Sequence, residues 1–556
     1  MYSFNTQATL HLSRTRFPLK GTVSTTFNMG KLVPFKCFEI LPADTFPIEN
    51  ISFLLRTTHP LIKPIMGNLF FNLYVVFVPT RLVDEHWEEI MGENKQGPWI
   101  TNKTTYECPK ITPPTGGWNN TGIAGQLGLA TYKEYDAVNR NPISAYCQLW
   151  NDLFRDENLM NFTHITKSGD LVGSNAGNYV TDAELGGELL PVCKKHDIFT
   201  SLLPEPQKGP DVLLPLGTFA PVIGDGRTLG LVDGSTSSAA FGALGIKSGT
   251  QTLGVYSSIA SKELGSATNN LDFGTAMYGN RALGVSTNKQ SSGLIADLTD
   301  AASAKISDVR LAVALQQMFE LDARGGTRYI EIILNHFGVR SDDARLQRAE
   351  YIGGKSIPIN INQVVQVSAS ADGSTPQGNL AGISMTFDKD SYSTKSFKEH
   401  GYLFILGAVK QEHTYQNGLH PMFNRLKRTD FYDPIFANIG EQPYYKRALD
   451  VTGDSAVDNK VLGYNEPWVD YKYMTNEIKG QFKSNDPKSL DIYHLGDEYS
   501  GEVTLGEQFI IETPNNLDRC LSVPSTEQDQ FIIDMDFYIP AVRVMPVHAI
   551  PGLKRL

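Results

Sequence analysis

The amino-acid sequence predicts a mainly β protein in which strands are joined by many turns and long loops. The chain has 556 residues, and its 23 tyrosines and 28 phenylalanines favour pleated strands. Its 49 glycines and 30 prolines are typical of frequent turns. Apolar residues at 533, 535, 537 and 539 alternate as in a strand with one buried face. Because single cores stop growing near roughly 250 to 300 residues, we expect one large domain with long insertions, or two to four domains.

The charge balance and the cysteines limit the classes of protein that are possible. The chain carries 49 basic and 60 acidic residues, a net charge of −11 at pH 7. This disfavours a surface that is basic throughout and wraps nucleic acid, although a local basic patch remains possible. Five cysteines without C-x-x-C spacing indicate neither a disulfide framework nor a zinc site, and favour a reducing compartment. The N-terminus lacks a signal peptide and the longest apolar run is too short for a bilayer, so we expect no membrane insertion.

The N-terminal part of the chain predicts an arm, several strands and a short helix. Residues 1–20 are polar and basic and predict an N-terminal arm, with a first edge strand as the alternative. Short strands follow, divided by turn formers at Gly30 and at residues 42–44. The run 69–78 is apolar on both alternating faces, which predicts a central strand covered on both sides. Residues 82–91 have apolar side chains at helical spacing and predict a short amphipathic helix.

The remainder predicts three helical segments, one long insertion and further strands. An aromatic stripe predicts a helix at 144–158. Residues 217–303 are crowded with Gly, Ser, Ala and Thr, which predicts an exposed or partly disordered insertion. A helix is expected from a cap at Ser307 to residues 325–326, followed by a helical or extended piece at 329–336. Further strands are predicted at 382–387, 402–409, 508–512 and 531–547.

Residues 320–362 hold the densest mixture of arginines, carboxylates and glycines, which suits either an anion-binding catalytic site or a contact surface. The string GGKS resembles the end of a phosphate-binding loop, but Ala349 stands where the motif needs its first glycine. The chain has no G-x-S-x-G motif, and His413 and His420 flank a loop rather than sharing a helix face. Acidic pairs such as Asp497-Glu498 are more simply solvated carboxylates than calcium ligands. We therefore expect no catalytic residue, no metal site and no cofactor.

Ten long and rare strings, collinear along the chain, carry a resemblance to a known family. The strings are TTFNMGKLVPFKCFEILPADTF (25–46), FVPTRLVDEHWEEIMGE (77–93), LWNDLFRDENL (149–159), KKHDIFTSLLPEPQKGP (194–210), DARGGTRYIEIILNHFGVRSDDARLQRAEYIGGKSIPININQVVQ (322–366), KSFKEHGYLFILG (395–407), HTYQNGLHPMFNRLKRTDFYDPIFANIGEQP (413–443), GYNEPWVDYKY (463–473), SLDIYHL (489–495) and RVMPVHAIPGL (543–553). They resemble the major capsid protein of microviruses, in the gokushovirus-like branch of small single-stranded DNA phages. The match covers nearly the whole chain and departs at Glu205, at residues 554–556 and at 217–303, where the family is variable.

The resemblance implies a fold, partners and a location. It implies an eight-stranded antiparallel viral jelly-roll barrel, a discontinuous domain of residues 21–216 and 304–556 with long insertions that contain short helices. Many copies would form a small icosahedral shell around circular single-stranded DNA. The companions would be a small basic DNA-binding protein and a minor pilot protein, and residues 217–303 would project outward to meet a host surface receptor. The protein would be part of the virion and be assembled in the host bacterial cytoplasm.

The resemblance and the charges together suggest two groups of contact residues. The candidates for inner-face DNA contacts are Arg14, Arg16, Lys20, Arg425, Lys427 and Arg428. Bases could stack on Phe423, Phe431 or Tyr432, although packed loop aromatics are the simpler interpretation. The candidates for contacts between loops or subunits are Arg324, Arg328, Arg345 and Arg348, because arginine forms bidentate hydrogen bonds with carboxylates. The alternative functions are a jelly-roll carbohydrate-binding protein or enzyme and a receptor-binding spike.

Overall fold

The computed structural model describes most of the chain. The described residues are 14–93, 95, 104–210, 212, 222–224, 229–233, 241–244, 283–285, 294–296, 306–325, 329–338, 347–367, 377–499 and 501–548. The chain divides into two compact units, one formed by Met1–Lys208 with Glu320–Leu556 and the other by Gly209–Phe319. The surfaces described below lie in the first unit.

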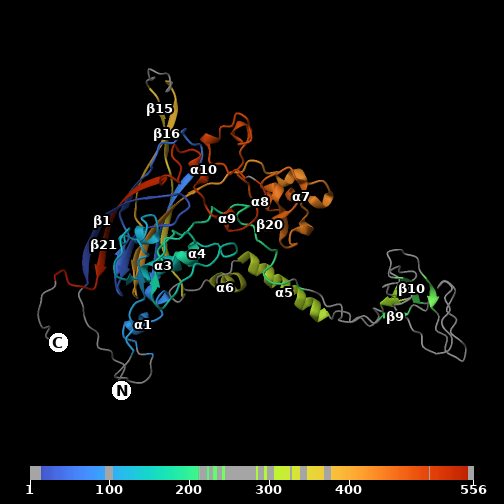
Figure 1. Cartoon of the computed structure of the whole chain (residues 1–556), viewed down its shortest axis with the longest axis horizontal. Coiled ribbons are helices and arrows are strands. Elements are labelled where there is room, and N and C mark those ends of the chain that lie inside the picture. Colours follow the sequence, from blue (N-terminus) through green and yellow to red (C-terminus); the bar gives the residue numbers. More distant parts are fainter. Residues whose placement is uncertain are drawn as a thin grey trace. The chain divides into compact units, whose positions relative to one another are not determined.

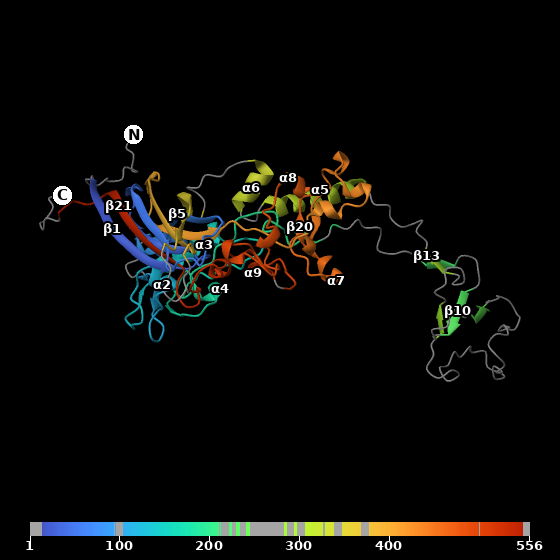
Figure 2. The ribbon, with the colours of Figure 1, turned by 90° about the horizontal axis from the view of Figure 1, so that it is seen from above.

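Two antiparallel sheets form the centre of the first unit (Figure 1 and Figure 2). The larger sheet has the order β15-β16-β4-β21-β3-β17, with β1 paired to β21, and the smaller has the order β14-β5-β18-β2. The strands of the larger sheet are β1 (Thr15–Phe27), β3 (Thr45–Pro47), β4 (Ile51–Thr57), β15 (Ile361–Val365), β16 (Leu380–Asp390), β17 (Thr394–Ser396) and β21 (Phe531–Arg543). The strands of the smaller sheet are β2 (Val33–Ile40), β5 (Leu69–Pro79), β14 (Glu350–Pro358) and β18 (Gly401–Gln411).

The first and last strands of the chain, β1 and β21, lie side by side over their whole length (Figure 1). Pro18 is directly opposite Pro540 in this pair. Neither proline has a backbone N–H, so both fit only at a position where the opposed residues exchange no hydrogen bonds. This requirement helps to fix the register, which turns Phe27 and Phe531 toward the core and leaves Lys20 on the exposed face.

Aromatic rings from the facing sides of the two sheets fill the core. Phe53 of β4 lies 4.9 Å from Phe71 of β5, measured between ring centroids. Phe27 of β1 stacks on Phe531 at 5.7 Å and meets Phe35 of β2 edge-on at 5.8 Å. All of these rings are buried, and such contacts stabilise a core beyond the burial of their apolar area.

The longest described helix of the N-terminal half, α3 (Asn141–Leu153), is fixed to the strands and loops beside it. The hydroxyl of Tyr146 donates a hydrogen bond to the carbonyl of Leu32 at the start of β2. The indole N–H of Trp150 donates to the carbonyl of Pro191 at 2.7 Å. Both side chains are fully buried, so α3 is part of the core rather than a surface helix.

Short elements occupy the long connections between the strands. The short strands of the first unit are β6 (Lys110–Thr112), β7 (Val138–Asn139), β8 (Leu171–Val172), β19 (Gln442–Tyr445) and β20 (Val461–Asn465). The α-helices are α1 (Trp87–Ile90), α2 (Ile123–Gln126), α4 (Tyr179–Asp182), α6 (Tyr329–Phe337), α7 (Ser455–Asp458), α8 (Val469–Lys472), α9 (Glu507–Ile510) and α10 (Asn515–Asp518). The 3-10 turns are η1 (Thr80–Leu82), η4 (Pro421–Asn424), η5 (Arg428–Asp430), η6 (Pro434–Phe436), η7 (Lys446–Ala448), η8 (Gly480–Phe482) and η9 (Asp491–Tyr493).

The described elements of the second unit lie in or beside the predicted insertion. They are β9 (Val222–Gly224), β10 (Leu229–Asp233), β11 (Phe241–Leu244), β12 (Leu283–Val285) and β13 (Leu294–Ala296). The helix α5 (Ile306–Gly325) follows them and continues into the first unit. The role of residues 217–303 as an exterior protrusion stays a prediction, because most of that segment lies outside the described residues.

Most of the predicted long elements are confirmed. The mainly β class is confirmed, and the strands expected at 69–78, 382–387 and 402–409 correspond to β5, β16 and β18. The helix expected at 144–158 corresponds to α3, and the piece at 329–336, for which the sequence allowed a helix or an extended segment, is the helix α6. Residues 15–20, for which the sequence allowed an arm or an edge strand, form the beginning of β1.

Three local predictions differ from the structure in whole or in part, each for a local reason. The strand expected at 508–512 is largely the helix α9, because an apolar run this short has no periodicity that separates buried strand from buried helix. The helix expected at 82–91 is reduced to η1 and α1, since the carboxylate of Asp84 accepts the backbone N–H of His86 at 3.1 Å and forms a turn there. Ser307 is not a cap, because α5 already begins at Ile306.

Candidate interaction surfaces

Two neighbouring loops of the first unit expose many large apolar side chains. We call the exposed side chains of residues 422–439 and 471–474 the aromatic surface. Its large apolar members are Met422, Phe423, Leu426, Phe431, Tyr432, Ile435, Phe436, Ile439, Tyr471, Tyr473 and Met474. Leu426, Ile435 and Met474 are 86%, 83% and 94% exposed. Exposed apolar side chains gathered in this way mark a surface that another molecule covers.

Arg425 joins the two loops that carry the aromatic surface. Its guanidinium donates to the carboxylate of Asp470 at 2.5 Å and to the backbone carbonyl of Asp430 at 3.1 Å. The guanidinium also lies over the ring of Tyr471, 4.3 Å from its centroid. The side chains of Arg425 and Asp470 are only 10% and 9% exposed. A buried, hydrogen-bonded pair of this kind holds both loops in one geometry.

Short carboxylate turns shape the first loop. The carboxylate of Asp430 accepts the backbone N–H groups of Leu426 and Lys427 at 2.9 and 2.8 Å, and these hydrogen bonds lower the pKa of Asp430. The carboxylate of Asp433 accepts the backbone N–H of Ile435 at 3.0 Å. These hydrogen bonds satisfy backbone N–H groups within the loop and fix the turns that carry the exposed side chains.

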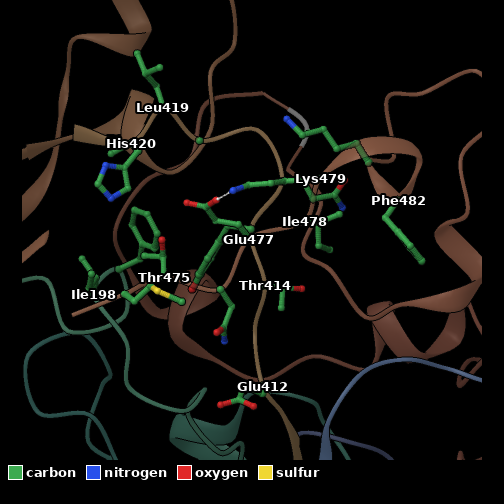
Figure 3. A pocket seen from close by; sticks show the side chains of 18 of the residues that line it. Ile198, Glu412, Thr414, Leu419, His420, Thr475, Glu477, Ile478, Lys479 and Phe482 are labelled. Carbon is green, nitrogen blue, oxygen red and sulfur yellow. Dashed lines mark ion pairs between the residues drawn. The ribbon is translucent and has the colours of Figure 1, made fainter. Parts of the chain in front are cut away.

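A cleft of about 1090 Å³ adjoins the aromatic surface (Figure 3). Met422, Phe423 and Met474 belong to both the cleft and the aromatic surface. Figure 3 shows the ion pair between Glu477 and Lys479, which is 2.6 Å long, on the cleft wall. The cleft thus combines an apolar lining with charged groups, as an interaction site does.

A buried ionic cluster lies at the base of the loops that line the cleft. The two ring nitrogens of His413 are 2.8 Å from a carboxylate oxygen of Asp497 and 3.1 Å from one of Glu512. Burial alone would lower the pKa of His413, but the hydrogen bonds to both carboxylates outweigh it and raise the pKa to about 9. Burial would raise the pKa of Asp497, but its hydrogen bond with His413 and the charge of Lys194 lower it to about 2. The cluster therefore holds a charged imidazolium between two carboxylates.

Comparison with known proteins decides the family. A family model described as "Capsid protein (F protein)" matches residues 6–553. The chain is 35% identical over 558 residues to "Capsid protein VP1" of Spiroplasma virus 4, covering 98% of this chain and 96% of that protein. The chain belongs to this capsid protein family. It is also 35% identical to "Capsid protein VP1" of Bdellovibrio phage phiMH2K, over 99% of this chain and 97% of that protein. The same name is carried by a relative from Chlamydia phage 1, which is 33% identical over 100% of this chain and 98% of its own length.

In this capsid protein the three cations of the first loop that the sequence suggested as DNA contacts differ in their exposure and in their contacts. Lys427 and Arg428 are exposed, whereas Arg425 is engaged with Asp470 and acts within the loop. Phe423 is 64% exposed and Phe431 and Tyr432 are each 51% exposed. The interpretation as packed loop aromatics holds for Tyr432, whose ring centroid is 5.7 Å from that of Trp468 and 6.4 Å from that of Tyr471, whereas Phe423 and Phe431 remain more than half exposed. Contact with DNA stays a prediction.

The three cations near the N-terminus, which were also suggested as DNA contacts, differ in the contacts that they already make within the chain. The guanidinium of Arg14 donates to the carbonyl of Ala43 and, at 2.7 Å, to the hydroxyl of Thr45. Arg16 and Lys20 lie on the exposed face of β1. The ammonium group of Lys20 is 5.1 Å from the ring centroid of Tyr538 on β21. Arg16 and Lys20 are thus available for further contacts, while Arg14, which immediately precedes β1, is already bonded to Thr45 of β3.

Of the four arginines expected to tie loops together, two lie among the described residues. Arg324 at the end of α5 forms an ion pair with Glu441, whose side chain is only 2% exposed. This pair links α5 to the loop before β19, as the prediction requires within one chain. Arg348 is half-buried, and the neighbouring backbone N–H of Ala349 donates to Asp152 at 2.8 Å. Arg328 and Arg345 lie outside the described residues.

Sequence reasoning missed the ionic cluster of His413, because it placed this histidine only beside a loop and gave it no partner. Asp497, interpreted as a solvated carboxylate, is buried, and this correction follows from its contact with His413. Within the described part of the chain, no group of His, Cys, Asp and Glu side chains could hold a metal ion. In that same part, no helix is both long and apolar enough to cross a membrane.

Proposed function

We propose that this chain is the major capsid protein of a small phage, and that copies of it assemble into an icosahedral shell around circular single-stranded DNA. The observation that carries the proposal is the aromatic surface. The buried pair of Arg425 and Asp470 holds it in a fixed geometry, and its apolar side chains are exposed, although the chain as a whole is highly charged, with a net charge of −11. A protein of a capsid family has copies of itself as the natural partner for such a surface. The role is structural rather than catalytic.

We propose further that eight strands form a viral jelly roll. These are the eight longest described strands of the first unit, namely β1, β2, β4, β5, β14, β16, β18 and β21. Numbered one to eight along the chain, they lie in the orders 1-8-3-6 and 2-7-4-5. This alternation between two facing sheets, with the first and last strands adjacent, supports a jelly roll.

Contacts with other virion components are also proposals. We place DNA phosphates near Arg16, Lys20, Lys427 and Arg428, because these cations are exposed and each could release a counterion. Rings of the aromatic surface that copies of the chain leave uncovered would stack on bases beside the last two cations. The resemblance adds a small basic DNA-binding protein, a minor pilot protein, a host receptor for residues 217–303, and assembly in the host cytoplasm. Charge reversal at the correct cations should yield shells with less DNA.

The experiment is shell formation by purified protein, observed by negative-stain microscopy and sedimentation. The wild-type chain should form closed shells, and Ile435→Asp should lower their yield at least about tenfold, because a charge buried in an interface is costly. The matched control is Val172→Asp, since Val172 is 66% exposed but lies outside the aromatic surface. A wild-type monomer that binds glycans would support the carbohydrate-binding or spike alternative. Normal shells from Ile435→Asp would refute the role of the aromatic surface.

A further inference from the structure

The strand β15 (Ile361–Val365) is an edge strand with one open side. Among the described strands it pairs with β16 alone, and it stands with β16 at one extremity of the larger sheet (Figure 1). The carbonyl of Asn360 accepts a hydrogen bond from the β16 residue Met385, so the even-numbered residues of this segment face β16. Successive residues of a strand alternate between its two sides. The backbone groups of the odd-numbered residues therefore point to the open side.

Three residues, Ile361, Gln363 and Val365, present their backbone N–H and C=O groups at this open side. No hydrogen bond to these groups from the open side occurs within the described part of the chain. Gln363 and Val365 are exposed, and Val365 is 45% exposed. An unpaired row of donors and acceptors with β-branched side chains is a template for another strand.

The other edge strands of the two sheets are protected against such pairing. Their charged residues and prolines are Arg16, Pro18 and Lys20 in β1, Pro34, Lys36 and Glu39 in β2, Glu350, Lys355 and Pro358 in β14, and Lys395 in β17. By contrast, the sequence has no charged residue between Lys355 and Asp372, and no proline in residues 361–367. Charges and prolines are the usual means by which proteins prevent edge-to-edge pairing. Their absence from β15 alone marks it as a pairing site.

We propose that β15 pairs in antiparallel fashion with β15 of a second copy of this chain, across a two-fold axis at Gln363. In this register Ile361 lies opposite Val365 of the second copy, and Gln363 lies opposite its own equivalent. All three residues face the new partner with their backbone groups, so the pair gains up to about six backbone hydrogen bonds. The opposed Gln363 amides bond to each other, and each Ile361 side chain meets a Val365 side chain.

The neighbouring surface of the sheet favours a second copy over a charged partner. On β16, Ile383, Met385 and Phe387 are 48%, 56% and 68% exposed, and Ile383 lies beside Asn362 of β15. Pairing would extend this apolar row across two copies and would bury no unpaired charge from residues 361–367. The inference rests on the proposed self-assembly, because it names one surface through which copies meet.

Cysteine cross-linking of the full chain tests the register. In the proposed pair the two Cα atoms at position 363 are about 5.5 Å apart, within disulfide reach. Gln363→Cys should therefore give a covalent dimer in most of the assembled protein after mild oxidation. The control is Asn362→Cys, whose two Cα atoms would be diagonal and more than about 7 Å apart, beyond disulfide reach. The wild-type chain measures the background from the five native cysteines.

Charge variants provide a second readout that a merely structural role would not produce. Gln363→Lys and Gln363→Glu should each lower the yield of shells at least about fivefold, because like charges would face each other across the axis. Coexpression of the two variants should restore the yield, and Asn362→Lys should leave it unchanged. The inference would be overturned if Gln363→Cys formed normal shells but no covalent dimer. It would also be overturned if coexpression of Gln363→Lys and Gln363→Glu gave a shell yield midway between the yields of the two variants alone. If the wild-type chain forms no shells, the proposed function fails instead, and microscopy shows this independently of the cross-link.

Discussion

Replacement of His413 by glutamine should remove a pH-dependent part of the stability of this capsid protein. The imidazolium lies between Asp497 and Glu512 in a buried site. A second cation, the ammonium group of Lys194, lies 3.6 Å from a carboxylate oxygen of Asp497. Glutamine keeps a hydrogen-bonding side chain at position 413 but cannot carry the positive charge. The substitution therefore tests the charge of the ring rather than its volume.

The expected magnitude follows from the pKa of His413, which is 6.5 for an unperturbed side chain and about 9 in the folded chain. Because the folded-state pKa is the higher one, the stabilisation is fully present below about pH 6.5 and is lost as the pH rises through about 9. The difference, 9 minus 6.5, is roughly 2.5 units, which corresponds to about 3 kcal/mol of unfolding free energy. The wild-type chain should lose this amount between about pH 6 and pH 9.5.

Denaturant unfolding of the unassembled chain at a series of pH values measures the effect. His413→Gln should be less stable than the wild type at pH 6, because two buried carboxylates lose their cation. Its stability should lack the wild-type decline between about pH 6.5 and pH 9. His164→Gln is the control, since His164 is exposed, and it should retain the decline. A decline of equal size in His413→Gln and the wild type would refute the ionic role of His413.

Two further substitutions test the ion pairs that hold the loops. Arg425→Ala should destabilise the chain by about 3 kcal/mol or more, because Asp470 would remain buried without its partner. Limited proteolysis measures this, since the variant should be cleaved faster than the wild type near the aromatic surface. Cleavage at the wild-type rate would contradict the prediction. Arg324→Ala should cost about 2 kcal/mol in thermal unfolding, a smaller loss because Arg324 is 48% exposed although Glu441 is buried. An unchanged melting temperature would show that the Arg324 pair contributes nothing.

Long elements were predictable because their patterns persist over many residues. The strand β21 alternates buried and exposed side chains over most of its length, and β5 and β18 have apolar runs closed by turn formers or polar residues. The short run that became α9 offered no such period. At residues 82–91 the helical spacing was real, but the side chain of Asp84 formed a competing turn.

The candidate surfaces were harder to predict because their residues meet only after folding. Asp497 and Glu512 lie 84 and 99 residues after His413 in the sequence, so no spacing rule could connect them. The strings around Arg425 marked the right loop, but sequence alone could not show that Asp470 already engages the guanidinium. Nor could it show that the rings of Phe423 and Phe431 remain exposed.

The central position of β21 in the larger sheet has a consequence for the folding of a newly synthesised chain. This strand comes after all the other described strands in the sequence, yet it lies between β1 and β4 in the larger sheet. Until Arg543 has been synthesised, β1 has no neighbour on which to complete its ladder. A chain that stops before β21 lacks the strand that joins β1 to β4, so it cannot complete the larger sheet. The strand order thereby makes closure of the larger sheet depend on a segment more than 500 residues after β1.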